Sequence, residues 1–151
     1  MLLTGQAEIT IDAKQRLAVP SKFRSMLGED ETGWYCVPWP DGSILRLYPK
    51  PVFESQAGRL DDSLTAGSDA SKIDQSFGMA EQLEMDKSGR VRLPKWHIDL
   101  VGMPTDVMVV GARNRLEIHP RAAWQASLVD RFRDMAALYE RSERKQTEAR
   151  S

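Results

Sequence analysis

Two short segments carry the same acid–base pattern, an aspartate followed four residues later by an arginine. Asp12 and Arg16 form the first pair, and Asp86 and Arg90 form the second. In a turn, the carboxylate can accept backbone N–H bonds and pair with the guanidinium across the turn. Because a guanidinium has five donors in a rigid fork, it can hold the carboxylate and still contact a nucleic acid. The pattern therefore fits a purely structural turn, a nucleic-acid contact, or both.

Positive charge is concentrated around both pairs. Residues 12–24 carry four cations against one aspartate, a net charge of +3, and residues 86–95 also reach +3. The whole chain has a formal net charge of −1, so the remainder carries −7. Such a local basic surface on an acidic body suits contact with phosphates. The alternative is that these are ordinary solvated side chains, as charge runs usually are, but their recurrence in two diverged copies favours the first interpretation.

The two pairs belong to an internal repeat with a constant offset of 74 residues. It aligns 8–28 with 82–102, and after a loop of different length it aligns the segments that end at Pro49 and Pro120. The chain is thus a duplicated unit of about 45 residues. We divide it into a first half over 7–54, a linker with helix over 55–81, a second half over 82–125, and a C-terminal helix and polar tail over 126–151.

Each half is predicted to contain two strands, a short helix, two further strands and a second helix. Apolar and polar residues alternate over 8–12, the period of a half-buried strand, and the turns AKQ and KSG are expected to close a hairpin with the next strand. Gly89 can adopt a positive φ there, whereas Gln15 at the equivalent place is expected to strain or reshape the turn. The helix after Pro20 is expected to end at Gly28.

The segment from Arg121 predicts an amphipathic C-terminal helix. Its apolar stripe would pack on its own chain or on a neighbour. From about Glu140 the sequence is almost all polar, and we expect it to fray. The stripe consists of Trp124, Leu128, Phe132, Met135 and Tyr139.

Composition excludes several classes of protein. A hydrophobic content of 41% with 28% charged residues rules out a wholly disordered chain. No apolar run is long enough for a membrane span, and the N-terminus lacks the pattern of a secretory signal. Cys36 is the one cysteine, so an internal disulfide and a cysteine-based metal site are excluded. We therefore expect a cytoplasmic protein without membrane contact.

No catalytic residue and no cofactor can be assigned. Motifs for a nucleophile elbow, a phosphate loop, a dinucleotide fold or a zinc protease do not occur. His97 and His119 lack cysteine or acidic neighbours at ligand spacing, so we expect no metal site. We therefore predict no enzymatic activity and no small-molecule substrate.

The chain resembles the MraZ family of bacterial transcriptional regulators. The resemblance rests on the order and duplication of four segments, DAKQRLAVPSKFR, LRLYP, MDKSGRVRLP and MVVGARNRLEIHP. The resemblance covers the chain to about Trp124, and it departs at Gln15, where the family usually has glycine. It implies an α+β, mainly β fold. Two SpoVT-AbrB-like halves would interleave their hairpins into one double-split β-barrel with short peripheral helices.

The resemblance also implies a function. MraZ proteins control the gene cluster for cell division and cell-wall synthesis, usually as repressors that include their own operon, and they form rings of octamers or larger. We therefore expect a nucleoid-associated ring that binds short direct repeats in double-stranded promoter DNA without a cofactor. The alternative is an AbrB-like protein-interaction module of the antitoxin type. The implied DNA-binding residues are Arg16 and Lys14, matched in the second half by Arg90 and Lys87, with Asp12 and Asp86 as organisers.

Overall fold

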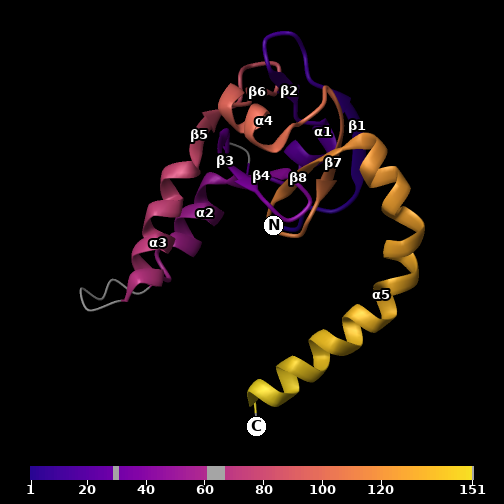
Figure 1. Cartoon of the computed structure of the whole chain (residues 1–151). Coiled ribbons are helices and arrows are strands. Elements are labelled where there is room, and N and C mark those ends of the chain that lie inside the picture. The colour runs from indigo at the N-terminus through magenta and orange to yellow at the C-terminus, as the bar shows by residue number, and fades with distance from the viewer. Residues whose placement is uncertain (29–30, 61–66, 151) are drawn as a thin grey trace. The chain divides into compact units, whose positions relative to one another are not determined.

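The computed structural model describes residues 1–28, 31–60 and 67–150, so residues 61–66 of the predicted linker lie outside it. The first half contributes β1 (Gln6–Thr10), β2 (Arg16–Ala18), α1 (Ser21–Arg24), β3 (Gly33–Trp39), β4 (Ile44–Pro49) and α2 (Lys50–Ala57). Between the halves lie α3 (Ser68–Ser76) and the 3-10 turn η1 (Phe77–Met79). The second half repeats the order as β5 (Glu81–Glu84), β6 (Arg90–Arg92), α4 (Lys95–Val101), β7 (Asp106–Gly111), β8 (Leu116–Pro120) and α5 (Arg121–Arg150), as Figure 1 shows.

The chain forms two compact units. Met1–Arg121 holds every described strand and the shorter helices, and Ala122–Ser151 holds the rest of α5. None of the helices in the described part of the chain has an apolar stretch long enough to cross a bilayer.

The main sheet has six antiparallel strands in the order β1-β7-β8-β4-β3-β5. Strand β1 pairs with β7 and β5 pairs with β3, so the first strand of each half completes the sheet of the other half. The β3–β4 and β7–β8 hairpins meet where β4 pairs with β8. The predicted α+β, mainly β class is confirmed. The described strands form an open sheet with two edges, however, and not a closed hydrogen-bonded barrel.

A second, two-stranded sheet joins β2 to β6. Leu17 lies opposite Val91, Arg16 opposite Arg92 and Ala18 opposite Arg90. With the repeat offset of 74, this register is symmetric about the Leu17–Val91 pair, so the halves meet as approximate twofold counterparts. The predicted turns form, but the prediction of hairpins is wrong, because the two strands that flank each turn do not pair with each other. The strand after each turn pairs with its counterpart in the other half, whereas the strand before each turn pairs with β7 or β3 and lies at an edge of the main sheet.

Apolar side chains from both halves fill one core. Alternation along the strands places them inward, since Leu17 and Val91 are fully buried between half-buried or exposed neighbours. Neither half encloses a core alone, because residues of both make up the single cluster of buried side chains. Its largest members include Phe23, Trp34, Leu45, Leu47, Leu93, Leu116 and Ile118.

The two short helices end differently. α4 ends as the sequence predicts, with Gly102 in the left-handed conformation at φ 68°. α1 already ends at Arg24, so the predicted end at Gly28 is wrong. The N–H groups of Met26 and Leu27 bond three residues back, to Phe23 and Arg24, which continues the chain as tight turns and not as α-helix.

α5 runs without interruption to Arg150. The predicted fraying after Glu140 is therefore wrong. Good helix formers fill this stretch, and Arg144 pairs with Glu140 one turn earlier at 3.6 Å. Trp124 of the predicted apolar stripe is half-buried, and the other four residues are solvent-exposed, with Phe132 at 76% of its full accessibility.

Candidate nucleic-acid interface

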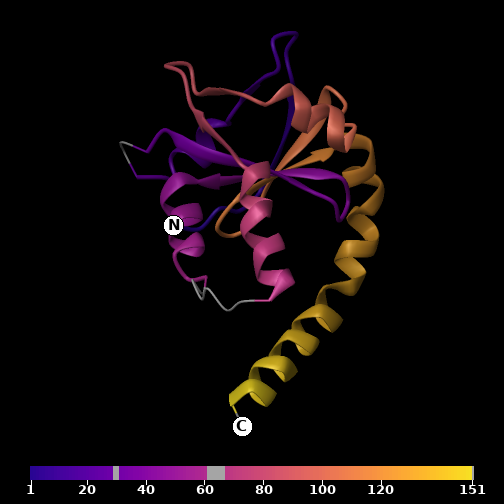
Figure 2. The same cartoon turned by 60° about the vertical axis from the view of Figure 1, so that its left-hand side comes forward.

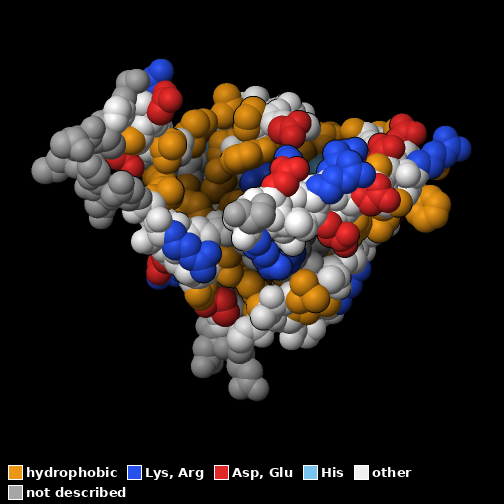
Figure 3. All heavy atoms as spheres, turned by 90° about the horizontal axis from the view of Figure 1, so that it is seen from below, with side chains coloured by type: hydrophobic (Ala, Val, Ile, Leu, Met, Phe, Trp, Pro, Cys, Tyr) orange, Lys and Arg blue, Asp and Glu red, His pale blue; other side chains and the backbone are white. Residues whose placement is uncertain are grey.

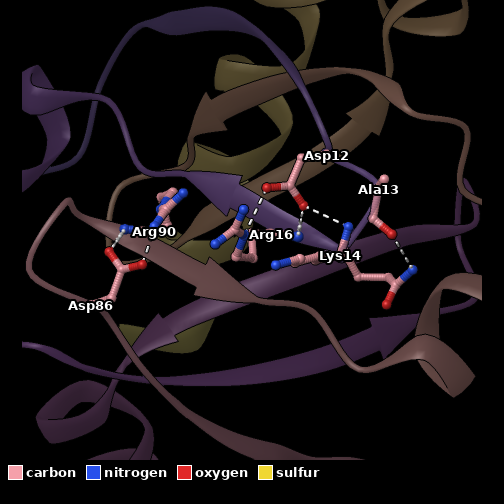
Figure 4. A network of polar contacts seen from close by, with 7 residues as sticks. Asp12, Ala13, Lys14, Arg16, Asp86 and Arg90 are labelled. Atoms are coloured by element: carbon pink, nitrogen blue, oxygen red, sulfur yellow. Dashed lines mark hydrogen bonds and ion pairs between the residues drawn. The ribbon is translucent and has the colours of Figure 1, made fainter.

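The first turn is organised by its aspartate. Asp12 Oδ1 accepts the backbone N–H groups of Lys14 and Arg16, each at 2.9 Å, and Oδ2 accepts Nε of Arg16 at 2.7 Å (Figure 4). The backbone of Gln15 also donates to the Asp12 carbonyl at 3.0 Å. These bonds favour the charged carboxylate and lower the pKa of Asp12, with the Arg16 N–H as the largest cause.

The second turn repeats this geometry. Asp86 Oδ1 accepts the N–H groups of Ser88 and Arg90 at 2.9 Å. Asp86 Oδ2 accepts Nε of Arg90 at 3.0 Å, and Figure 4 shows the two bonds from Arg90. Gly89 donates to the Asp86 carbonyl at 3.0 Å. The pKa of Asp86 is lowered, again chiefly by the backbone N–H of the arginine. The two turns thus have the same arrangement of hydrogen bonds around their aspartates.

The residue before each arginine takes a left-handed conformation. Gly89 has φ 77° and Gln15 has φ 60°. Gln15 therefore adopts the conformation that the turn requires. Of the two outcomes expected from the sequence, a strained or a reshaped turn, this conformation fits the first. For a residue with a side chain this conformation costs roughly 1–2 kcal/mol.

Each arginine is tethered on one edge only. The hydrogen bonds described for the Arg16 and Arg90 side chains use Nε, and within the described residues their terminal Nη groups have no protein acceptor. Both side chains are partly exposed, at 28% and 35%. A guanidinium held in this way presents two parallel N–H groups, which match a phosphate or the edge of a guanine.

The two lysines of the predicted site are not equivalent. Both are exposed, but with the offset of 74 Lys14 corresponds to Ser88, whose N–H makes the same bond to the turn aspartate. Lys87 corresponds to Ala13. The turns therefore carry one lysine each at successive positions, and the matching of Lys14 with Lys87 is wrong.

The turns share one surface. Both project from the same end of the Met1–Arg121 unit, away from α2 and α3 (Figures 1 and 2). Because Leu17 and Val91 point into the core, the flanking residues of β2 and β6 face outward. Arg92 thereby lies opposite Arg16 on the outer face. The sequence-based site omitted Arg92, although the strand alternation already placed it outside.

The histidines have structural partners. His97 is fully buried, with Nε2 2.7 Å from the Met79 carbonyl oxygen and Nδ1 3.3 Å from Cys36 Sγ. Burial lowers the pKa of His97 and raises the pKa of the Cys36 thiol. His119 Nε2 lies 2.9 Å from a Glu117 carboxylate oxygen. Among the described residues, no three potential ligands cluster as a metal site would require.

Comparison with known proteins places this geometry in a family. The model of a family described as "MraZ protein, putative antitoxin-like" matches residues 2–73 and 76–146. The chain belongs to the MraZ family. One MraZ match falls on each half, and the second continues beyond Trp124, where the resemblance seen in the sequence ended, to include most of α5.

Several MraZ relatives align over most of their length, and each is named Transcriptional regulator MraZ. The one from Neisseria meningitidis is 36% identical over 132 residues, which are 86% of this chain and 87% of that protein. The relative from Nitratidesulfovibrio vulgaris is 32% identical over 139 residues, covering 89% and 91%. That from Thiobacillus denitrificans is 31% identical over 132 residues, covering 84% and 86%.

Proposed function

We propose that this chain is a DNA-binding transcriptional regulator without enzymatic activity. The observation that carries the proposal is the pair of turns, each of which fixes an arginine by Nε and leaves its Nη edge outward. The names of its relatives support a role in transcription. Double-stranded DNA is the partner that two outward guanidinium groups on one cationic surface fit best.

Each part of the turn then has a role. Arg16 and Arg90 contact phosphates or guanine edges in a promoter, and Lys14 and Lys87 add charge toward the backbone. Asp12 and Asp86 hold the two arginines in place and do not contact DNA. Phosphate contacts set the position on the duplex, and arginine contacts to bases supply sequence specificity.

We also infer that the subunits assemble into a ring, octameric or larger. A single pair of turns makes few phosphate contacts, so one subunit binds weakly and in a salt-dependent way. Joining several subunits raises the effective affinity by roughly 10²–10⁴ where the geometry permits simultaneous contact. The ring therefore binds several short direct repeats and not a single palindrome.

Exposed apolar side chains support self-association. Figure 3 shows hydrophobic side chains gathered on the face seen from below. In the Met1–Arg121 unit, a groove of about 410 Å³ is lined mainly by apolar side chains, among them Trp39, Met79 and Leu100. Surfaces of this kind mark interaction sites in soluble proteins.

We propose the finer cellular role from the resemblance to the MraZ family. We propose a repressor of the gene cluster for cell division and cell-wall synthesis and of its own operon, located in the cytoplasm at the nucleoid. The interleaved halves would form a double-split β-barrel, a proposal supported by the exchange of β1 and β5 between the halves. The proposed boundaries remain 7–54, 55–81, 82–125 and 126–151.

The test is protection mapping on the DNA upstream of this gene at two salt concentrations, together with gel-shift titration of variants. Arg16→Ala is expected to abolish binding and to leave the mass of the assembly unchanged. Arg90→Ala is expected to have an equal or smaller effect. Arg59→Ala removes an exposed arginine just after the end of α2, far in sequence from both aspartate–arginine turns, and serves as the control.

Two outcomes would contradict the proposal. Unchanged affinity of Arg16→Ala would remove the turns from the interface. Co-purification of a small partner protein without any DNA shift would favour an antitoxin-type module.

A further inference from the structure

A third arginine lies against the second turn, and it comes from the first half of the chain. Arg24 is the last residue of α1 and is exposed. A Cβ built on Gly89 would lie only 2.8 Å from its Cζ and Nε and 2.9 Å from Nη1. The guanidinium therefore occupies the space that any side chain at position 89 would need.

Arg24 is tethered in the same manner as the two turn arginines. Its Nε donates to the Val19 carbonyl at 3.0 Å, and the N–H of Val19 donates to the Gly89 carbonyl at 2.9 Å. Within the described residues its Nη groups have no protein acceptor. As far as the described residues show, Arg24 thus shares three features with Arg16 and Arg90, namely a hydrogen bond from Nε, Nη groups without a protein acceptor and a place at a turn.

At the first turn, the position equivalent to Arg24 is not an arginine. The equivalent backbone bond exists there, since Leu93 N–H donates to the Gln15 carbonyl at 2.8 Å. With the offset of 74, however, position 24 corresponds to Ile98, which is half-buried against the core. At the second turn, Arg24 of the first half thus lies against Gly89, whereas the equivalent positions at the first turn are Ile98 and Gln15. The two turns are unequal although their aspartate–arginine cores are alike.

We propose that Arg24 is a further DNA-binding residue, which contacts a backbone phosphate beside the second turn. We also propose that Gly89 permits this position of Arg24, because a residue without a side chain leaves space for the guanidinium. The inference rests on the proposed function. A phosphate is the expected partner because Arg24 stands at the side of the turn, and most hydrogen bonds from proteins to DNA go to phosphates and sugars. The second turn then makes one more electrostatic contact than the first.

The salt dependence of binding tests the assignment. Affinity for the upstream duplex is measured by anisotropy between 50 and 200 mM salt, for the full chain and its variants. Loss of one phosphate contact lowers the slope of log K against log salt by about 0.9. We expect Arg24→Ala to lose about that much slope and about tenfold in affinity at low salt. Arg24→Lys, which retains the charge, is expected to keep the slope, and Arg59→Ala is expected to match the wild type.

A double-mutant cycle tests the role of Gly89. Gly89→Ala adds a methyl group where the guanidinium lies, so we expect it to weaken binding when Arg24 is present and to have little effect in the Arg24→Ala background. An equal effect in both backgrounds would assign the loss of affinity to the turn backbone, and would overturn the proposal that Gly89 leaves space for the Arg24 guanidinium.

The failure of this inference is distinguishable from failure of the proposed function. If Arg16→Ala loses binding but Arg24→Ala keeps both the slope and the affinity of the wild type, Arg24 is a structural tether and only the further inference fails. If the wild-type chain itself does not bind the duplex, the proposed function fails.

Discussion

At the scale of single residues, each turn aspartate puts negative charge beside the surface that we propose meets DNA. Asp12 accepts three hydrogen bonds from its own turn, and Asp86 does the same. The role of each aspartate in DNA binding is therefore indirect. It fixes the backbone and the Nε of the arginine, so that the Nη edge has one orientation before DNA arrives.

Replacing Asp12 by alanine separates orientation from charge. Simple electrostatics predicts tighter binding of Asp12→Ala to DNA, because a negative charge is removed. We expect weaker binding by about tenfold, since Lys14 N–H and the Arg16 side chain lose their acceptor, and tenfold corresponds to roughly 1.4 kcal/mol. Anisotropy titration at fixed salt measures the change. Asp69→Ala, at an exposed carboxylate of α3, is the control, and affinity at or above that of the wild type would refute the orienting role.

Buried His97 makes the stability of the fold depend on pH. Its ordinary pKa is 6.5, and burial lowers the pKa in the folded protein, so unfolding takes up a proton below pH 6.5. We expect the free energy of unfolding to be highest above pH 6.5 and to fall as the pH drops through that value toward the folded pKa. Urea denaturation at pH 7.5 and 5.5 measures this difference.

His97→Phe is the matched variant, because Phe23 occupies the equivalent buried position of the first half. It is expected to be less stable than the wild type at pH 7.5, since the Cys36 thiol and the Met79 carbonyl lose their partner. The decrease in stability between the two pH values should be smaller than in the wild type. An equal decrease in both proteins would show that other groups cause it.

The sequence predicted the residues of the turns better than their surroundings. Asp12, Arg16 and their counterparts are close in the chain, so spacing alone specified their contacts. The neighbour of Gly89 is Arg24, from the other half, and the partner of His97 is Cys36, 61 residues away. Such pairs depend on how the halves interlock, and no local pattern encodes them.

At the scale of elements, the turn at Gln15 retains strain that the second turn avoids. Gln15→Gly removes the cost of a left-handed residue with a side chain, partly offset by the greater flexibility of glycine in the unfolded state. We expect a gain of up to about 1 kcal/mol in stability, measured as a higher midpoint in thermal unfolding. Gly89→Gln, the reverse change in the second turn, should lower the midpoint. A fall in the midpoint for Gln15→Gly would show that Gln15 stabilises the turn through its side chain.

Strands and helices were largely predictable, and their partners were not. Alternating apolar residues correctly placed the strands of both halves, including β2 and β6. A hairpin between β1 and β2 was the natural expectation from a three-residue turn, but β1 pairs with β7 and β2 pairs with β6, both from the other half. The length of α5 was underestimated, because its polar end is stabilised by helix propensity and by charge pairs such as Glu140 with Arg144, and not by a buried face.

At the scale of the whole molecule, the exposed stripe on α5 bears on the proposed assembly. Phe132 and Tyr139 are 76% and 65% exposed, an arrangement that costs solubility in a monomer and gains stability when a second copy covers it. We expect the double variant Phe132→Ser and Tyr139→Ser to have a lower mass by light scattering than the wild type. Arg133→Ser on the same helix is the control. An unchanged mass would place the subunit contacts outside α5.

The exchange of strands between the halves has a consequence for synthesis on the ribosome. Gln6 in β1 finds its partner only when Val110 in β7 has been made. At translation rates of roughly 5–20 residues per second, the intervening stretch of about 100 residues takes on the order of 5–20 seconds. During that time the nascent first half exposes a strand that nothing yet covers, as aggregation-prone edges do. A chain released early would keep this edge open, so we expect truncated products to be insoluble or degraded.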